Sequence, residues 1–195
     1  MKILVRNPLI HWSLQLNFVD PTRTGFRAEV IKMNTNRAIV RVRGKRRRLT
    51  LAEYIRRRNG VAVGASGSLR NMLRRSLGAG SFAGFWQYWN PVFGYGLARY
   101  VHSPLIRVLP PTAAIIVTFT VCGALHDLVT MAVRGSPTLL FTPWFSLLGI
   151  GVVLGRATRM DLSSRPWLIR VTVNLTYIVA CLAVTLAARR VFAIP

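Results

Sequence analysis

Long apolar runs fill the second half of the chain and determine its expected architecture. Three of them come close to the roughly 20 residues that a helix needs to cross a hydrocarbon core of about 30 Å; they occupy residues 109–132, 138–155 and 168–188. The first begins at Pro110 and Pro111, where proline suits a helix start because its missing N–H would have no intrahelical partner. The second is short and contains Pro143. The pattern predicts about three membrane-spanning helices.

The segment 82–101 has a different pattern, amphipathic and rich in aromatic side chains. These aromatic residues are Trp86, Tyr88, Trp89, Tyr95 and Tyr100. Rings with one polar edge favour the boundary between lipid headgroups and acyl chains. We therefore expect an aromatic amphipathic helix here that lies in the interface or is partly inserted.

Part of the N-terminal region has the alternation of a β-strand. Residues 26–33 and 37–43 alternate roughly between apolar and polar side chains around Asn34, Thr35 and Asn36. Two such runs joined by turn-forming residues predict a β-hairpin. The composition of this region is also compatible with partial disorder.

Two short helices are predicted after this hairpin. Thr50 and Glu53 have the spacing of a capping box, in which each side chain accepts a hydrogen bond from a backbone N–H of the first turn. Gly60 would end this helix, and the Gly- and Ser-rich residues 60–68 form a linker. A short basic helix over residues 69–77 follows.

Charge divides the chain into two parts. The 195 residues are 52% hydrophobic and yet carry a formal net charge of +22. Residues 1–80 hold 18 of the 27 Lys and Arg against three acids, whereas residues 81–195 hold nine against two. This segregation predicts a small basic appendage over residues 1–80 and a membrane domain over residues 81–195.

The distribution of arginine predicts the orientation in the membrane, because short loops rich in Lys and Arg stay in the cytoplasm. The basic N-terminal part and the loop with Arg156 and Arg159 then lie on the cytoplasmic side. Arg189 and Arg190 fall on the opposite side, against the rule. The chain is expected to be an all-α integral membrane protein of the bacterial inner membrane with a cytoplasmic N-terminus.

Two runs of basic residues, Lys45-Arg46-Arg47-Arg48 and Arg56-Arg57-Arg58, could contact anions, and Arg46, Arg47 and Arg48 are the candidate site. Basic segments beside a membrane contact anionic headgroups at about 1 kcal/mol per residue. Lipid contact or topology control is the favoured interpretation, an anionic cofactor or substrate head is second, and nucleic acid is last because no nucleic-acid-binding module accompanies the run.

Cysteine and histidine give no sign of a metal centre or a disulfide. Cys122 and Cys181 both lie in predicted spans, and His11, His102 and His126 lack the spacing of metal ligands. We expect no metal and no bound cofactor.

His126 is the polar residue with the clearest chemical interpretation. It lies about 22 Å along the first predicted span from Pro111, where an ionisable group is costly and often functional. A neutral imidazole can act as a general base, and Gly123 one turn earlier would leave volume for a substrate atom. The alternative is a structural histidine that hydrogen-bonds between helices. Asp127 points elsewhere on the helix, toward an arginine or the end of a neighbouring helix.

Several short motifs occur in the order found in one family of membrane enzymes. They are Phe85-Trp86, Trp89-Asn90, Phe93-Gly94-Tyr95-Gly96, Tyr100-Val101, Ser103-Pro104, Thr118-Phe119 and Gly123-Ala124-Leu125-His126. Over residues 82–130 the chain thereby resembles the membrane-bound O-acyltransferase family, whose members usually have many more spans. In that family an asparagine and a later membrane histidine line the tunnel where acyl donor and acceptor meet. The resemblance implies that His126 is the base, that Asn90 positions donor or acceptor, and that Trp86, Trp89 and Gly123 contact substrate.

The resemblance implies an acyltransferase-like protein that moves an acyl group from a thioester such as acyl-CoA to a hydroxyl acceptor. The thioester would be a co-substrate, with its anionic head on the arginine-rich side. The alternative is a non-catalytic membrane subunit that packs in a larger assembly or a homo-oligomer. Three spans bury little interior, which favours dependence on a partner. In both cases the bilayer and its anionic lipids are expected partners.

Overall fold

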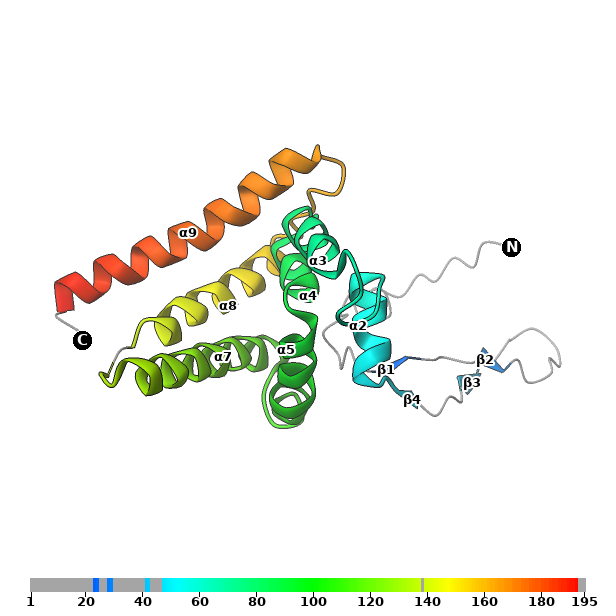
Figure 1. The fold of residues 1–195 in the computed structure, drawn as a ribbon, viewed down its shortest axis with the longest axis horizontal. Helices are drawn as coiled ribbons and strands as arrows, with labels where there is room; N and C mark the ends of the chain where they lie inside the picture. The colour runs from blue at the N-terminus through cyan, green and yellow to red at the C-terminus, as the bar shows by residue number, and fades with distance from the viewer. Residues whose placement is uncertain (1–22, 25–27, 30–40, 43–46, 138, 193–195) are drawn as a thin grey trace.

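The computed structural model describes residues 23–24, 28–29, 41–42, 47–137 and 139–192. Almost all regular structure in these ranges is helical, which confirms the expected helical class (Figure 1). The helices are α2 (Leu51–Asn59), α3 (Ser68–Leu77), α4 (Phe82–Tyr88), α5 (Pro91–Gly96), η1 (Leu97–His102), α6 (Ser103–Leu105), α7 (Pro111–Arg134), α8 (Phe141–Ala157) and α9 (Trp167–Phe192).

Four short strands form two antiparallel pairs. β2 (Ala28–Glu29) pairs with β3 (Arg41–Val42), and β1 (Arg23–Thr24) pairs with β4 (Arg47–Arg48). In the first pair Ala28 lies opposite Val42, and these positions are equidistant from Thr35. The pairing direction and centre are those of the predicted hairpin, and its turn lies outside the described residues.

The two short helices begin and end where the sequence predicts. Thr50 and Glu53 form the capping box at the start of α2, with the Glu53 N–H donating to the Thr50 hydroxyl over 3.3 Å and the Thr50 N–H donating to the Glu53 carboxylate over 2.9 Å. Gly60 ends α2 in the left-handed conformation at φ 85°. Turns connect it to α3.

The aromatic segment is broken into pieces, and the expectation of one continuous helix was wrong. α4 ends at Tyr88 with Trp89 as its C-cap, Asn90 adopts φ 40°, and α5 starts at Pro91. The side-chain oxygen of Asn90 accepts a hydrogen bond from the Phe93 N–H at 3.2 Å and so caps α5. Left-handed backbone is tolerated by asparagine, and proline suits the first turn, so the break follows from these two residues.

Two of the described helices are long and apolar enough to cross a membrane: α7, and α9 over Trp167–Val191. The third predicted span corresponds to α8, an apolar helix of 17 residues. Three spans are therefore not supported by helix length and composition. All three helices lie side by side, and α7 and α8 form a hairpin (Figure 1). Their shared core contains Ile115, Phe119, Cys122, Phe145, Leu148, Val152 and Cys181.

The start of α8 is held by an acid from α7. Asp127, which is 1% exposed, accepts hydrogen bonds from the backbone N–H groups of Leu140 (3.0 Å), Phe141 (2.8 Å) and Thr142 (2.7 Å), and from the Thr142 hydroxyl (2.6 Å). The next residue, Pro143, has no N–H to satisfy. The first-turn donors of α8 that lack intrahelical partners are thus all accounted for. Asp127 caps a neighbouring helix, one of the two roles that the sequence suggested.

Close contact between the long helices depends on glycine. A Cβ on Gly123 of α7 would collide with the backbone of α8 at Phe141 and Thr142, and one on Gly151 of α8 would collide with the Tyr177 ring of α9. Gly155 faces open space. Small residues are the usual means by which membrane helices approach closely.

Gly123→Ala is expected to destabilise the protein by about 1–3 kcal/mol, because the added methyl group meets backbone that cannot move aside as a side chain can. Gly155→Ala is the matched control. It adds the same methyl group where nothing is near and should be neutral or slightly stabilising, since alanine favours helix. Unfolding of both variants by SDS in mixed micelles measures the difference. Equal stability would contradict the close α7–α8 contact.

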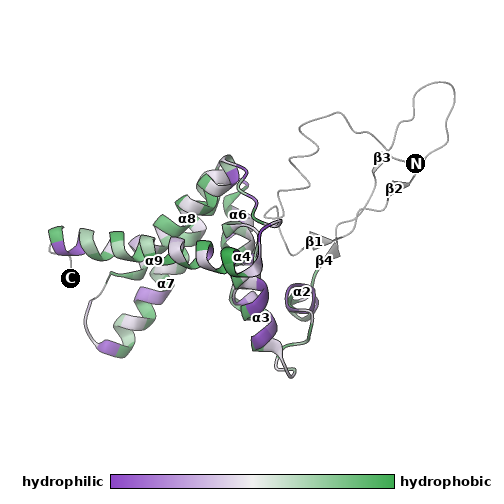
Figure 2. Ribbon diagram, turned by 90° about the horizontal axis from the view of Figure 1, so that it is seen from above, coloured by the Kyte–Doolittle hydropathy of each residue, from purple (hydrophilic) through white to green (hydrophobic). Residues whose placement is uncertain are grey.

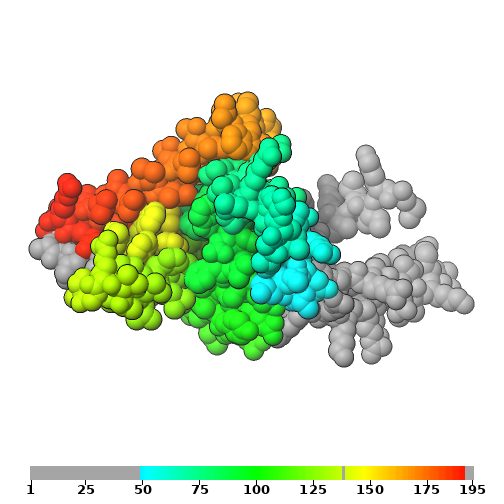
Figure 3. Space-filling model, viewed as in Figure 1, coloured from blue at the N-terminus to red at the C-terminus, as the bar shows by residue number. Residues whose placement is uncertain are grey.

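The basic helices α2 and α3 pack against α5 and α4 instead of standing apart from them (Figure 3). The Tyr95 hydroxyl donates to the Leu49 carbonyl at 3.1 Å, and the Tyr54 and Tyr95 rings are 5.4 Å apart. Asn174 of α9 donates to the carbonyls of Leu77 (3.1 Å) and Ala79 (3.0 Å), next to the end of α3. The division at residue 80 stays a prediction, and residues on both sides of it are in direct contact.

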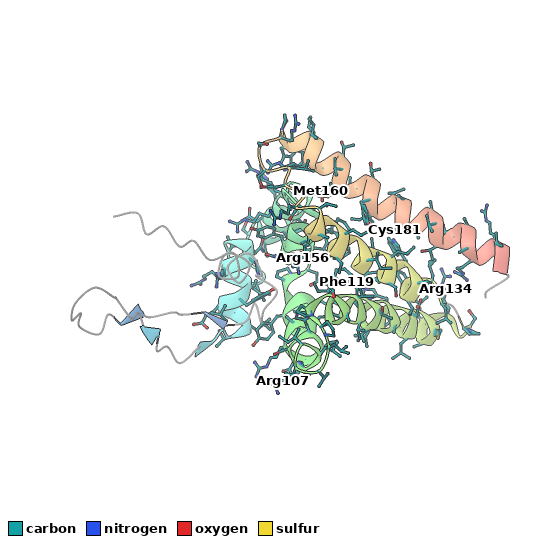
Figure 4. All side chains as sticks on the ribbon, turned by 180° about the vertical axis from the view of Figure 1, so that it is seen from behind. Arg107, Phe119, Arg134, Arg156, Met160 and Cys181 are labelled. Carbon is teal, nitrogen blue, oxygen red and sulfur yellow. The ribbon has the colours of Figure 1, made fainter. Side chains whose placement is uncertain are left out.

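The loop between α8 and α9 is tied to the same end of the molecule. The Leu162 N–H donates to the Gly80 carbonyl at 2.7 Å. Asp161 accepts hydrogen bonds from the Ser163 hydroxyl (2.5 Å) and N–H (2.9 Å), which lower the pKa of its carboxyl below the usual value. Arg156 and Met160 lie at the end of the molecule toward α2, whereas Arg134 lies at the far end (Figure 4).

Candidate functional site

A cavity of about 490 Å³ lies where the aromatic segment meets the long helices. Its wall is made mainly by apolar side chains of α4, α5, α7 and α8, with Leu73 and Leu77 of α3 and Leu175 and Ile178 of α9 completing it. This is the size and character of a pocket for an apolar or amphiphilic small molecule. Its polar lining residues are Tyr54, Arg58, Gln87, Asn90, Thr118 and His126.

His126 lines this cavity with a defined hydrogen bond. Its Nδ1 lies 2.7 Å from the Cys122 carbonyl oxygen, one turn earlier in α7. A carbonyl oxygen only accepts, so Nδ1 carries the proton and donates it. In a neutral imidazole the other nitrogen, Nε2, is then the acceptor. A ring held in this tautomer can take a proton from a ligand at Nε2.

Aromatic rings surround the imidazole of His126. It stacks on the Phe145 ring at 5.1 Å between centroids and meets the Phe141 ring at 5.5 Å and the Phe93 ring at 5.6 Å. Phe93 belongs to α5 and the other two to α8, so two helices besides α7 fix the ring's position.

Asn90, the other residue of the predicted pair, lines the same cavity. Its Oδ1 accepts the Phe93 N–H and is occupied by this capping role. Its Nδ2 has no partner within the part of the chain that the structure describes. That amide N–H₂ group can donate to an oxygen of a bound molecule.

The two predicted substrate-contacting tryptophans both line the cavity but differ in setting. The Trp86 ring packs at 5.2 Å from Phe119 and 5.9 Å from Phe145, measured between centroids. Its indole N–H is buried and has no hydrogen-bond partner among the described residues. Trp89 stacks on Phe85 at 5.5 Å and is 38% exposed. A buried donor without a partner is unusual in a native protein and needs an explanation.

Of the remaining predicted site residues, the structure describes Gly123, Arg47 and Arg48, and none of these lines the cavity. Gly123 packs against the backbone of α8, so the expectation that it leaves volume for a substrate was wrong. The reason is its place on α7, because the side of the helix on which Gly123 lies faces the start of α8. Arg46 lies outside the described residues, and Arg47 and Arg48 form strand β4.

Sequence reasoning missed the contribution of α2 to the site. Tyr54 and Arg58 both line the cavity, and they are one helical turn apart. Residues four apart on a helix lie side by side, and the buried Tyr54 marks this face of α2 as the inner one. That spacing is the signal from which Arg58 could have been found. The sequence marked Arg58 only as a member of a basic run and gave Arg46, Arg47 and Arg48 as the candidate anion contacts.

Comparison of the chain with family models, with curated proteins and with solved structures finds no match. The resemblance to membrane-bound O-acyltransferases therefore stays a hypothesis that depends on the residues themselves.

Proposed function

We propose that the chain is an integral membrane protein in which α7 and α9 cross the bilayer and the shorter α8 carries the chain back between them. Figure 2 supports this placement, because hydrophobic residues dominate these helices while hydrophilic residues gather on α2 and α3. Arg107 and Arg156 lie toward the α2 end (Figure 4). By the positive-inside rule that end faces the cytoplasm. Arg134, Arg189 and Arg190 would lie at the opposite surface.

The proposed orientation predicts the labelling of single cysteines in intact cells. Ser136→Cys, in the α7–α8 loop, should react with a membrane-impermeant maleimide added outside. Met160→Cys, in the α8–α9 loop, should react only after the cells are opened. The unsubstituted chain is the control, since Cys122 and Cys181 are buried. Labelling of position 160 from outside would contradict the arrangement.

We further propose that the cavity holds an acyl chain and that the protein transfers it from a thioester to a hydroxyl acceptor. The observation that carries this proposal is the meeting of His126 and Asn90, which are 36 positions apart in the sequence, on one apolar cavity. The unprotonated Nε2 of His126 would accept the proton of the acceptor hydroxyl. The hydroxyl oxygen would then attack the thioester carbonyl carbon.

The rest of the proposed reaction uses the same two side chains. The Nδ2 group of Asn90 would donate a hydrogen bond to the carbonyl oxygen as negative charge develops on it. When the carbon–sulfur bond breaks, the imidazolium would return its proton to the leaving thiolate. The products are an ester and a free thiol, and the histidine ends in its starting state. Acyl-CoA is one donor of this class.

Comparison of lipid and metabolite profiles from cells with and without the protein tests this function. We expect an ester that depends on the protein. Unchanged profiles would contradict acyl transfer.

A non-catalytic role as a membrane subunit is the second candidate, and the exposure of α9 favours it. Leu168, Val179 and Val191 on this helix are 70%, 61% and 76% exposed. Lipid can cover such a surface, and so can a partner helix in a larger assembly. Loss of a membrane complex in cells without the protein, together with unchanged lipids, would favour this role over catalysis.

A further inference from the structure

The cationic residue of the cavity, Arg58, lies where the hydrophilic helices meet the apolar ones. It extends from α2 into the cavity wall, beside Gln87 of α4. Figure 2 shows hydrophilic residues on α2 and α3 and hydrophobic ones on α7–α9. The cavity therefore has a charged lining residue from the hydrophilic side and an apolar interior formed by the long helices.

The guanidinium of Arg58 is only partly used by the protein. Its Nη1 donates to the Gln87 side-chain oxygen at 2.8 Å, and its carbon lies 5.4 Å from the centre of the Tyr54 ring. Its Nε–H is buried and has no hydrogen-bond partner among the described residues. An arginine offers five N–H donors in a fixed fork, so most of its capacity remains for a ligand.

Within the described part of the chain, no ion pair joins Arg58 to an acidic residue. Asp127 accepts hydrogen bonds at the start of α8, Asp161 accepts one from Ser163, and Glu53 accepts one from Thr50. An arginine on the wall of an apolar cavity is costly without an anion. The planar guanidinium matches phosphate oxygens in pairs, which makes phosphate a suitable anion for this position.

We propose that Arg58 binds the phosphate of an amphiphile whose acyl chain fills the cavity. This inference rests on the proposed function for the acyl chain and adds the chemical class of its head. The amphiphile would be oriented in the cavity with its acyl chain beside His126 and its phosphate at Arg58. Phosphate of this kind occurs in acyl-CoA and in lysophosphatidate.

Brominated acyl chains provide a direct measurement of binding, because bromine quenches tryptophan fluorescence on contact. Three of the five tryptophans, Trp86, Trp89 and Trp144, line the cavity. The full chain in neutral detergent micelles would be titrated with three ligands that carry the same brominated chain: acyl-CoA, lysophosphatidate and the uncharged monoacylglycerol. Quenching by each ligand gives its affinity.

Arg58→Gln is expected to weaken binding of at least one phosphate-bearing ligand by about 10- to 100-fold, the usual effect of losing a hydrogen-bonded charge partner. Binding of monoacylglycerol should not change. The ligand that loses affinity identifies the source of the phosphate. Arg57→Gln is the matched control, since it removes the same charge from an exposed position of the same helix and should leave all three affinities unchanged.

The other outcomes separate this inference from the proposed function. Equal affinities of the unsubstituted chain and Arg58→Gln for both phosphate ligands would overturn the role of Arg58 while leaving the acyl cavity intact. An equal loss for monoacylglycerol, or the same loss in Arg57→Gln, would also overturn it. If no ligand quenched the tryptophans of the unsubstituted chain, the acyl cavity itself would be wrong.

Discussion

Replacing His126 with alanine is expected to lower the rate of acyl transfer by about 10²- to 10⁴-fold, the usual contribution of a positioned general base. The chain should still insert and fold. The imidazole already borders the cavity, so its removal enlarges an existing space and creates no new sealed void. The hydrogen bond from its Nδ1 to the Cys122 carbonyl is additional to the backbone hydrogen bonds of α7, and the substitution leaves no buried donor without a partner. Ester formation from a labelled thioester in proteoliposomes measures the rate.

Two comparisons make this result specific. Asn90→Ala should lower the rate by less, because it removes one hydrogen-bond donor to the substrate and leaves the base in place. It also removes the cap of α5. Thermal stability of both variants in detergent would show whether folding is affected. If His126→Ala prevents assembly, and no ester depends on the protein, then the histidine is structural and the proposed chemistry is wrong.

The helical elements could be predicted where local signals are strong. The capping box at Thr50 and Glu53 and the glycine at position 60 fix both ends of α2 through contacts within a few residues. Pro111 opens α7 for the same kind of reason. Long apolar runs then identify α7 and α9, because a run of that length has few alternatives to a long helix. These features need no knowledge of the tertiary structure.

The break in the aromatic segment was missed although its signal was present. Asn90 followed by Pro91 favours a turn and a new helix start, and both residues sit in an otherwise regular aromatic pattern. The periodicity of the rings outweighed this local signal in our expectation. Only the positive φ of Asn90 shows that the chain changes direction there. This turn brings Phe93 beside His126.

The candidate site was predictable only in part, because it depends on packing between distant segments. His126 stood out since a histidine in an apolar run is costly. The role of Gly123 could not be predicted, since sequence does not tell which side of α7 faces α8. Arg58 belongs to the cavity only through the packing of α2 on α4 and α5. A basic run in the sequence gives no information on which arginine points inward.

Asp127→Asn is expected to destabilise the protein by about 2–5 kcal/mol. The carboxylate accepts four hydrogen bonds at the start of α8, three of them from backbone N–H groups. An asparagine keeps one acceptor oxygen and turns an N–H₂ group toward the remaining donors. Each buried donor left without a partner costs about 1–3 kcal/mol, and the favourable charge at the helix N-terminus is lost as well. SDS unfolding in mixed micelles measures the change.

Asp161→Asn is the matched control for this prediction, since it makes the same replacement at an exposed aspartate. Its effect should stay within about 0.5 kcal/mol, as for most surface substitutions. Because Phe141 and Phe145 of α8 surround His126, the loss of the cap should also weaken ligand binding in the cavity. One combination of stability and activity results would give Asp127 another role. If Asp127→Asn unfolds like Asp161→Asn and still stops acyl transfer as His126→Ala does, the carboxylate takes part in the chemistry and is not a cap.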